Sequence, residues 1–211
     1  MSYDAFASTF SESRKNLRWG EIEYFMEYIE RRFPERKISI LDVGCGNGRF
    51  LETLETSGLL YSYLGIDESA WMVHEAKKLH LNQTFKVLDM IHIDELSSQE
   101  KCDVIVFIAS FHHLQTEQER IEVLQKTKRL LAPDGIIMMT NWNLLGEELF
   151  VKYEKSYKWK GDFEIKIGSH IRYYHGFTTE ELEILFEDAG YSIWENRVFE
   201  GGKNIVSIIA A

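Results

Sequence analysis

Short apolar runs alternate along this chain with stretches in which apolar side chains recur every three or four residues. The first pattern is typical of strands that are buried on both faces, and the second of helices with one buried face. Strands are predicted at residues 38–43, 61–66, 84–88, 104–108 and 135–141, and helices at 19–33 and at about 47–57, 69–79 and 117–131. This alternation predicts an α/β fold built on a doubly wound parallel sheet.

The C-terminal part of the chain carries three further signals. Residues 133–135 (Pro-Asp-Gly) form a turn signal that should stop the helix before them. Residues 178–181 (Thr-Thr-Glu-Glu) combine a capping pattern with an acidic first turn, and so predict another helix. Segments at about 191–199 and 204–210 flank a Gly-Gly pair, which predicts a closing β-hairpin.

Residues 144–177 do not fit the alternation, because a short connection is the norm between such elements. The segment has six Lys or Arg against five Asp or Glu, in a chain of net charge −10. Its aromatic residues are Phe150, Tyr153, Tyr157, Trp159, Phe163, Tyr173, Tyr174 and Phe177. Long insertions at the carboxyl edge of a parallel sheet lie over the active site, so we expect a lid whose run Arg172-Tyr173-Tyr174-His175 touches substrate or shapes its pocket. Alternatively, the aromatic side chains simply pack a small subdomain.

A glycine-rich turn follows the first predicted strand. Gly44, Gly46 and Gly48 stand at alternate positions, and a helical pattern begins at Phe50. A buried strand that turns sharply into a helix needs residues without a Cβ where the chain reverses and where a ligand lies against the backbone. The G-x-G-x-G spacing differs from the G-x-G-x-x-G of dinucleotide enzymes, and therefore favours a cofactor without a pyrophosphate. A purely structural turn is the alternative.

Acidic residues mark the ends of three predicted strands. Asp42 lies at the end of the first, Asp67 follows the second and Asp89 follows the third. Asp67 comes 19 residues after Gly48, close to the spacing of about 20 residues for a carboxylate that binds ribose hydroxyls. Because parallel strands point their carboxyl ends at one crevice, the three carboxylates should converge on one ligand. Alternatively, Asp67 and Asp89 only cap helices.

Composition sets wider bounds. The 211 residues, 45% of them hydrophobic, suit one domain over residues 1–211, with 144–177 as an insertion. The sequence has no run of 18 apolar residues, so no transmembrane span is expected. Its first residues lack the basic region followed by an apolar core that marks a secretion signal, so we expect a cytoplasmic protein. Cys45 and Cys102 neither suggest a disulfide framework nor have metal-ligand spacing with a histidine, so no metal is expected.

Five separated blocks resemble the class I S-adenosylmethionine-dependent methyltransferases. The blocks are Leu41 to Gly48, Leu64 to Ser69, Asp89-Met90, Phe111 to Leu114 and Leu130 to Gly135. The resemblance implies a Rossmann-like, seven-stranded, mostly parallel sheet with a C-terminal antiparallel hairpin, and S-adenosylmethionine as cofactor. It places the methionine part of the cofactor on the Gly44–Gly48 loop, the ribose on Asp67, the adenine amine on Asp89, and the amino group on main chain at Ile108 or Ala109. The cofactor residues expected in all are Arg14, Asp42, Gly44, Gly46, Asn47, Asp67, Glu68, Asp89, Met90 and Ile108.

Shorter blocks are similar to the wobble-uridine tRNA carboxymethyl methyltransferases. They are Phe10 to Arg14 followed by Trp19, then His112-His113-Leu114, and Arg172 to His175. This resemblance implies that a carboxymethyl group on a wobble uridine is converted to its methyl ester, with Arg14 helping to hold cofactor or substrate. Eukaryotic members work with a small zinc-binding partner protein. Charge is the departure from that family, because 24 basic against 34 acidic residues do not favour nucleic acid unless a local patch or partner supplies cations.

The chemistry of methyl transfer indicates which side chains could act on the acceptor. In-line displacement depends mainly on alignment. A carboxylate acceptor needs no general base but does need a cation to orient it, for which Arg172 is the candidate. A hydroxyl or amine acceptor needs a base, for which His113 or His112 is the candidate, unless these histidines only pack a loop. His74, His80 and His92 are expected on surfaces.

Three functions stay open at this point. The first is a methyltransferase that acts on tRNA, and the second is a methyltransferase that acts on the oxygen or nitrogen of a small metabolite. The third is a cofactor-binding scaffold without chemistry of its own. Retention of Gly44, Gly46, Asp67 and Asp89 argues against the scaffold, because a protein without activity would have little reason to keep all four.

Overall fold

A computed structural model describes residues 19–97, 101–168 and 170–211. Its centre is a seven-stranded sheet with the strand order β3-β2-β1-β4-β5-β9-β8. The strands are β1 (Ile38–Val43), β2 (Tyr61–Asp67), β3 (Thr84–Val87), β4 (Cys102–Ile108), β5 (Leu131–Trp142), β8 (Ser192–Val198) and β9 (Asn204–Ala210). Strands β1 to β5 pair in parallel, whereas β9 pairs antiparallel with both β5 and β8. The predicted α/β sheet with a closing hairpin is confirmed.

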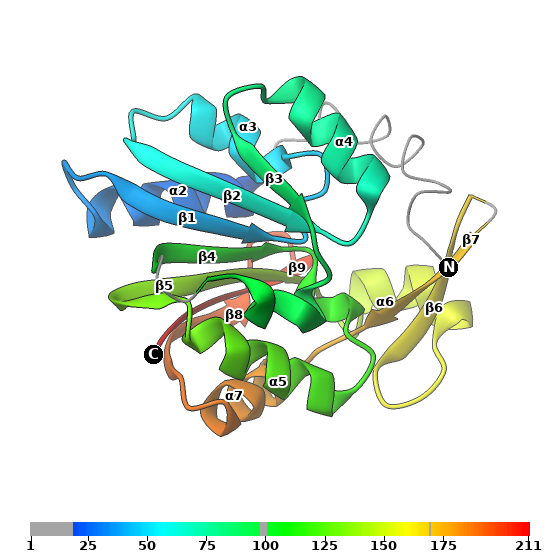
Figure 1. Cartoon of the computed structure of the whole chain (residues 1–211). Helices are drawn as coiled ribbons and strands as arrows, with labels where there is room; N and C mark the ends of the chain where they lie inside the picture. Colours follow the sequence, from blue (N-terminus) through cyan, green and yellow to red (C-terminus); the bar gives the residue numbers. More distant parts are fainter. Residues whose placement is uncertain (1–18, 98–100, 169) are drawn as a thin grey trace.

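Helices cover both faces of this sheet (Figure 1). They are α2 (Gly20–Arg32), α3 (Arg49–Glu55), α4 (Ala70–Leu79), α5 (Glu117–Lys128) and α7 (Thr179–Asp188). A further helix, α6 (Glu147–Tyr153), lies beyond the ends of the strands (Figure 1). Short 3₁₀ turns lie at η2 (Met90–Glu95), η3 (Phe111–His113) and η4 (Glu154–Ser156). In the part of the chain that the structure describes, no helix is long and apolar enough to cross a membrane.

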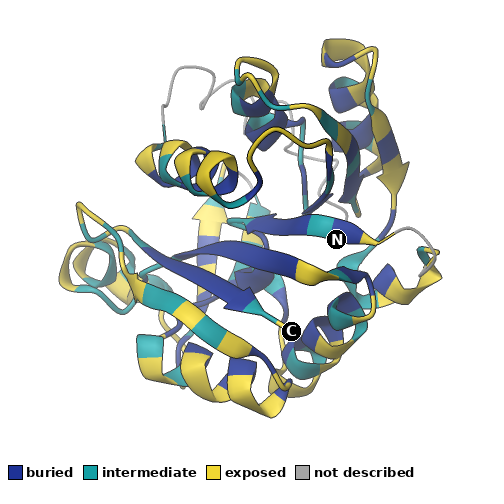
Figure 2. Cartoon of the chain, turned by 90° about the vertical axis from the view of Figure 1, so that its left-hand side faces the viewer, coloured by how far each residue is buried: buried dark blue, intermediate teal, exposed yellow. Residues whose placement is uncertain are grey.

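Two apolar clusters, one on each face, hold these layers together. Successive side chains of a strand point to opposite faces, so Ile40 packs with α2, α3 and α4, and Leu41 packs with α5 and α7. The central strands are buried on both faces, while the outer sides of the helices are exposed (Figure 2). This explains why β1 and β4 consist of nearly unbroken apolar runs.

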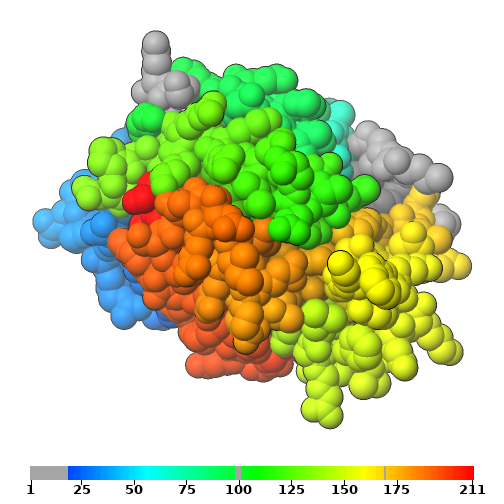
Figure 3. Space-filling model, turned by 90° about the horizontal axis from the view of Figure 1, so that it is seen from below, coloured from blue at the N-terminus to red at the C-terminus, as the bar shows by residue number. Residues whose placement is uncertain are grey.

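Residues 144–177 form a compact unit beyond the carboxyl ends of the strands (Figure 1). Helix α6 is followed by a two-stranded antiparallel sheet of β6 (Asp162–Ile167) and β7 (His170–His175). The unit has its own small core, in which Leu144, Phe163, Ile165 and Tyr174 are buried. Seen from below, it stands beside the face formed by α5 and α7 (Figure 3). Packing within a subdomain therefore accounts for several of the aromatic residues.

The structure corrects the predicted boundary around residue 131. Helix α5 ends at Lys128 and β5 already begins at Leu131, whereas the helix was expected to reach 131 and the strand to start at 135. The Pro-Asp-Gly sequence does not separate the two elements. It lies inside β5, where the register against β4 shifts between Cys102 and Val104. Pairing of Leu131 with Cys102 extends the strand past the local turn signal.

Candidate active site

A cavity of about 710 Å³ opens at the carboxyl ends of β1, β2 and β4. Its walls include every cofactor residue expected from the sequence within the described ranges: Asp42, Gly44, Gly46, Asn47, Asp67, Glu68, Asp89, Met90 and Ile108. Arg14 lies outside the described residues. The same cavity is also lined by His113 and by residues of β7, including Arg172 and Tyr173. The fold therefore brings the residues predicted to bind the cofactor and those predicted to act on the acceptor to the same cavity.

The glycine loop is shaped by left-handed backbone and by Asp67. Gly44 and Gly46 have φ angles of +74° and +55°. One carboxylate oxygen of Asp67 accepts from the Gly46 N–H at 2.9 Å, and the other accepts from the Ser69 N–H at 2.9 Å. Ser69, and not Asp67, is the residue that caps α4 through its side chain. Asp67 therefore joins the loop after β1 to the turn after β2.

Gly44 and Gly46 offer a matched pair of substitutions. A Cβ on Gly44 would lie 2.4 Å from the Cβ of Ser110, whereas a Cβ on Gly46 has no atom within 4 Å. Gly44→Ala should lower the free energy of unfolding by about 2 kcal/mol, because strain and overpacking add. Gly46→Ala should cost about 1 kcal/mol from backbone strain alone. Urea denaturation would measure both, and equal losses would contradict the close contact at Gly44.

Asp42 is a buried carboxyl group at the bottom of the cavity. The Tyr63 hydroxyl donates to its Oδ2 at 2.8 Å, while Oδ1 has no hydrogen-bond partner among the described residues. Burial raises the pKa of Asp42 to about 7, the hydrogen bond from Tyr63 opposes the rise, and nearby Asp67 adds to it. A buried oxygen of this kind would be stabilised by a cationic or hydrogen-bonding group in the cavity.

This pKa predicts a pH-dependent gain from Asp42→Asn. In the wild type, the unfolded carboxyl loses its proton near pH 3.8 and the folded one near pH 7. The folded state therefore binds more protons in this window, so stability falls as pH rises through it. Relative to wild type, Asp42→Asn should gain about 2 kcal/mol in free energy of unfolding between pH 5 and pH 8. Asp134→Asn, on the surface, is the control, and a constant difference would contradict the buried charge.

The third strand-end carboxylate serves both a local and a cavity role. Asp89 accepts from the Ile91 N–H at 3.1 Å and so caps the 3₁₀ turn η2, as the capping alternative proposed. It also lines the cavity, next to Met90. On the neighbouring strand, Ile108 lines the cavity, while the N–H of Ala109 already donates to Thr140. A cofactor amino group donates hydrogen bonds, so its main-chain partner would be a carbonyl oxygen, which the bond of the Ala109 N–H to Thr140 does not occupy.

His113 and β7 meet on the acceptor side of the cavity. His113 Nδ1 lies 3.1 Å from the main-chain oxygen of Tyr173, which can only accept. Nδ1 therefore carries the proton, and in the neutral ring Nε2 has the lone pair. The Arg172 guanidinium lies 5.7 Å from the centre of the Tyr174 ring, which fixes it against the hairpin. Burial raises the pKa of Glu68 across the cavity, and the charge of Arg172 opposes the rise.

Two other histidines lie in places that their sequence position did not reveal. His112 is fully buried, is absent from the cavity wall, and accepts from the Trp142 N–H through Nδ1. That position does not support a role as base. The expectation that His80 lies on the surface is wrong, because it is 5% exposed and bonded to Glu55. Its ring packs against Gly48, where a Cβ would come within 2.7 Å of it.

Some residues that line the cavity were not among the site residues predicted from the sequence. The Arg49 guanidinium lies 5.0 Å from the centre of the Trp19 ring, and both side chains line the cavity. Gln115, between η3 and α5, and Glu119, in the first turn of α5, line it as well. Position after the glycine loop could have drawn attention to Arg49. Nothing in the spacing of Gln115 and Glu119 marks them as cavity residues.

Comparison with known proteins agrees with this geometry. Residues 15–196 match the family model described as "Methyltransferase domain". A tRNA (carboxymethyluridine(34)-5-O)-methyltransferase of Arabidopsis thaliana is 32% identical over 142 residues, which are 66% of this chain and 31% of that protein. The protein of the same name from Schizosaccharomyces pombe is 26% identical over 216 residues, covering 92% of this chain and 88% of that protein. This chain thus spans less than a third of the plant relative.

A solved structure shares the fold at low sequence identity. It is the crystal structure of an S-adenosylmethionine-dependent methyltransferase from Clostridium acetobutylicum, with a TM-score of 0.71 and 14% identity. The match covers 98% of each chain. The similarity therefore extends over the sheet, its helices and the segment between β5 and α7.

Proposed function

This chain belongs to the methyltransferase domain family, and on that premise we propose that it methylates the carboxylate of a carboxymethyl group on a tRNA wobble uridine. It is an S-adenosylmethionine-dependent methyltransferase. The acceptor is the proposed part. Its main support is the position of Arg172, a cation that lines the same cavity as the glycine loop, together with the names of the two relatives.

The residues of the cavity fit S-adenosylmethionine. The buried Oδ1 of Asp42 can accept from an ammonium group or offset the charge of a sulfonium. The Asp67 carboxylate is at the cavity wall, where it can accept from ribose hydroxyls. Open space over Gly46 allows a ligand to lie directly against the loop. When bound, the cofactor supplies an electrophilic methyl group.

The protein's own side chains have the task of aligning the acceptor. A carboxylate is already a nucleophile at neutral pH, so the step needs no general base. Arg172 can bind such a carboxylate through two parallel N–H groups and thereby fix its direction of approach. His113 contributes a polar ring at the same wall. If the acceptor were a hydroxyl or amine instead, its Nε2 would be the group to take the proton.

Labelled methyl groups would test the acceptor directly. The protein is incubated with methyl-labelled S-adenosylmethionine and tRNA that carries carboxymethyluridine, and the RNA is then treated with mild alkali. A methyl ester is hydrolysed and releases its label as methanol, whereas N-methyl and ether-linked methyl groups stay on the RNA. Alkali-labile label on tRNA is expected. Label found only on small metabolites from a cell extract would replace this proposal with the metabolite alternative.

Salt dependence separates the two acceptor classes independently. Binding of tRNA releases counterions, so activity on tRNA should fall by about tenfold or more between 50 and 200 mM salt. Activity on a small metabolite should change little over that range. A flat profile would contradict the tRNA acceptor. Initial rates at subsaturating substrate are the measurement, with cofactor affinity at each salt concentration as the control.

A protein partner and a cytoplasmic location belong to the same proposal. The net charge of −10 makes the chain alone a poor ligand for RNA, so a basic partner protein would supply the missing cations. Such a partner would be supported if the protein methylates tRNA only after nuclease-treated cell extract is added. Cys45 and Cys102 are buried and form no disulfide, which is compatible with a reducing compartment.

A further inference from the structure

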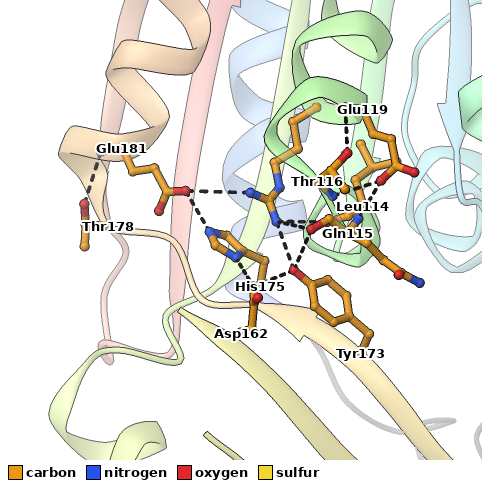
Figure 4. A network of polar contacts seen from close by, with 10 residues as sticks. Leu114, Gln115, Thr116, Glu119, Asp162, Tyr173, His175, Thr178 and Glu181 are labelled. Carbon is orange, nitrogen blue, oxygen red and sulfur yellow. Dashed lines mark hydrogen bonds and ion pairs between the residues drawn. The ribbon is translucent and has the colours of Figure 1, made fainter. Parts of the chain in front are cut away.

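A cluster of polar side chains joins the β6–β7 hairpin to the main body of the protein (Figure 4). Its centre is His175, which is 4% exposed and lies at the end of β7. Nδ1 of His175 is 2.9 Å from an oxygen of Asp162, its cross-strand neighbour on β6. Nε2 is 2.7 Å from an oxygen of Glu181 on α7. One ring thus lies between two carboxylates from different elements.

The two contacts can be satisfied by different numbers of protons on the ring. A neutral imidazole has a single N–H and would direct the lone pair of its other nitrogen at a carboxylate oxygen. A protonated ring donates from both nitrogens and makes two charge-assisted hydrogen bonds. Among the residues that the structure describes, the other charged group in contact with the cluster is Arg120 of α5, whose Nη1 is 3.9 Å from Glu181. With His175 protonated, two cations and two carboxylates balance.

The same cluster reaches the cavity wall through Tyr173. The hydroxyl of Tyr173 is 2.6 Å from Asp162 and receives an N–H from Arg120 at 3.1 Å. Burial, together with the hydrogen bond to Asp162, raises the pKa of Tyr173, so the hydroxyl keeps its proton. Its main-chain oxygen accepts from His113. A displacement of β7 would therefore move Tyr173, Arg172 and the ring of His113 together.

We propose that His175 is held as an imidazolium between Asp162 and Glu181, and that this ion cluster positions Arg172 and His113 for the acceptor. His175 is a positioning residue, since it acts through β7 and does not line the cavity. The proposal rests on the proposed function for the role of Arg172 and His113. The protonation state of His175 and the attachment of the hairpin do not depend on the acceptor.

Nitrogen NMR of the histidine rings would test the protonation state. The signals of His175 are assigned by their loss in His175→Gln, with His74→Gln on the exposed face of α4 as the control. Both ring nitrogens of His175 should carry protons at pH 7. Glu181→Gln removes one of the two charged acceptors and should leave one ring nitrogen without its proton at pH 7. An unprotonated ring nitrogen at pH 7 in wild type would overturn the proposal.

Activity and hydrogen exchange test the positioning role. His175→Gln should lower kcat/KM about tenfold with unchanged cofactor affinity, and should speed exchange of the amides of β6 and β7 after correction for intrinsic rates. Wild-type activity should fall at alkaline pH, and Glu181→Gln should move this fall to lower pH, which a loss of packing alone would not do. An unshifted profile would overturn the role. If His175→Gln does not fold, the pH profiles of the wild type and of Glu181→Gln test the positioning role without it.

The outcomes for the cluster and for the acceptor are separable. The His175 ring could prove doubly protonated, with slow hydrogen exchange of the β6 and β7 amides, while tRNA is not methylated. That result would support the ion cluster and contradict the proposal that tRNA is the acceptor. Conversely, alkali-labile methylation of tRNA with a neutral His175 would retain the proposed function and remove the ion cluster.

Discussion

Asp67→Ala should bind S-adenosylmethionine about 100-fold more weakly than wild type, which corresponds to about 3 kcal/mol. Two effects add. The ribose diol loses a charged acceptor, and the glycine loop loses the hydrogen bond from the Gly46 N–H to the Asp67 carboxylate. The N–H of Ser69 loses its acceptor as well. Titration calorimetry with the cofactor is the measurement.

Asp134→Ala, at an exposed position remote from the cavity wall, is the matched control and should bind like wild type. Asp67→Asn helps to separate the two effects, because its amide oxygen can still accept from one main-chain N–H while the charge is gone. It should bind with intermediate affinity. Wild-type affinity in Asp67→Ala would show that the carboxylate does not contact the cofactor.

Arg172→Ala should lower kcat/KM for the carboxylate acceptor about 100-fold, and Arg172→Lys about tenfold. Lysine keeps the positive charge but cannot make the two parallel N–H bonds that orient a carboxylate. We expect cofactor affinity to stay near the wild-type value in both variants, because Arg172 is not one of the residues predicted to hold the cofactor. Steady-state kinetics with tRNA, combined with calorimetry, would measure the two quantities separately.

Lys166→Ala on the neighbouring strand is the control for a loss of charge on the hairpin, because Lys166 is exposed and does not line the cavity. It should leave turnover on tRNA near the wild-type value. If both Arg172 variants bind cofactor normally and also turn over at wild-type rates, Arg172 is a surface residue and the hairpin is not a lid over the acceptor.

The sequence by itself determined the sheet, most element boundaries and one group of residues that line the cavity. Unbroken apolar runs indicate strands covered on both faces, and this property depends on local composition. Alternate glycines after the first strand and acidic residues at strand ends predict a shared crevice, because parallel strands present their carboxyl ends together. Asp42, Gly46, Asp67 and Asp89 therefore meet where the spacing predicted.

Tertiary structure decided which of several equivalent side chains face the cavity. His112 and His113 are adjacent in sequence, but the turn η3 buries the first against Trp142 and directs the second to the wall. His80 follows a polar helix end and still becomes buried, since Gly48 leaves room for its ring. Such outcomes depend on neighbours far along the chain, and a local pattern contains no information about them.

The polar cluster at His175 shows the same limit most clearly. The run Arg172 to His175 could be singled out from sequence, but the partners of its histidine are Asp162 on another strand and Glu181 on a helix. Arg120 joins them from α5, 55 residues before His175. Periodicity predicts that these helices and strands exist. Only the packing of α5, α7 and the hairpin against one another decides that their charges meet, because contacts between elements depend on how the elements pack in three dimensions.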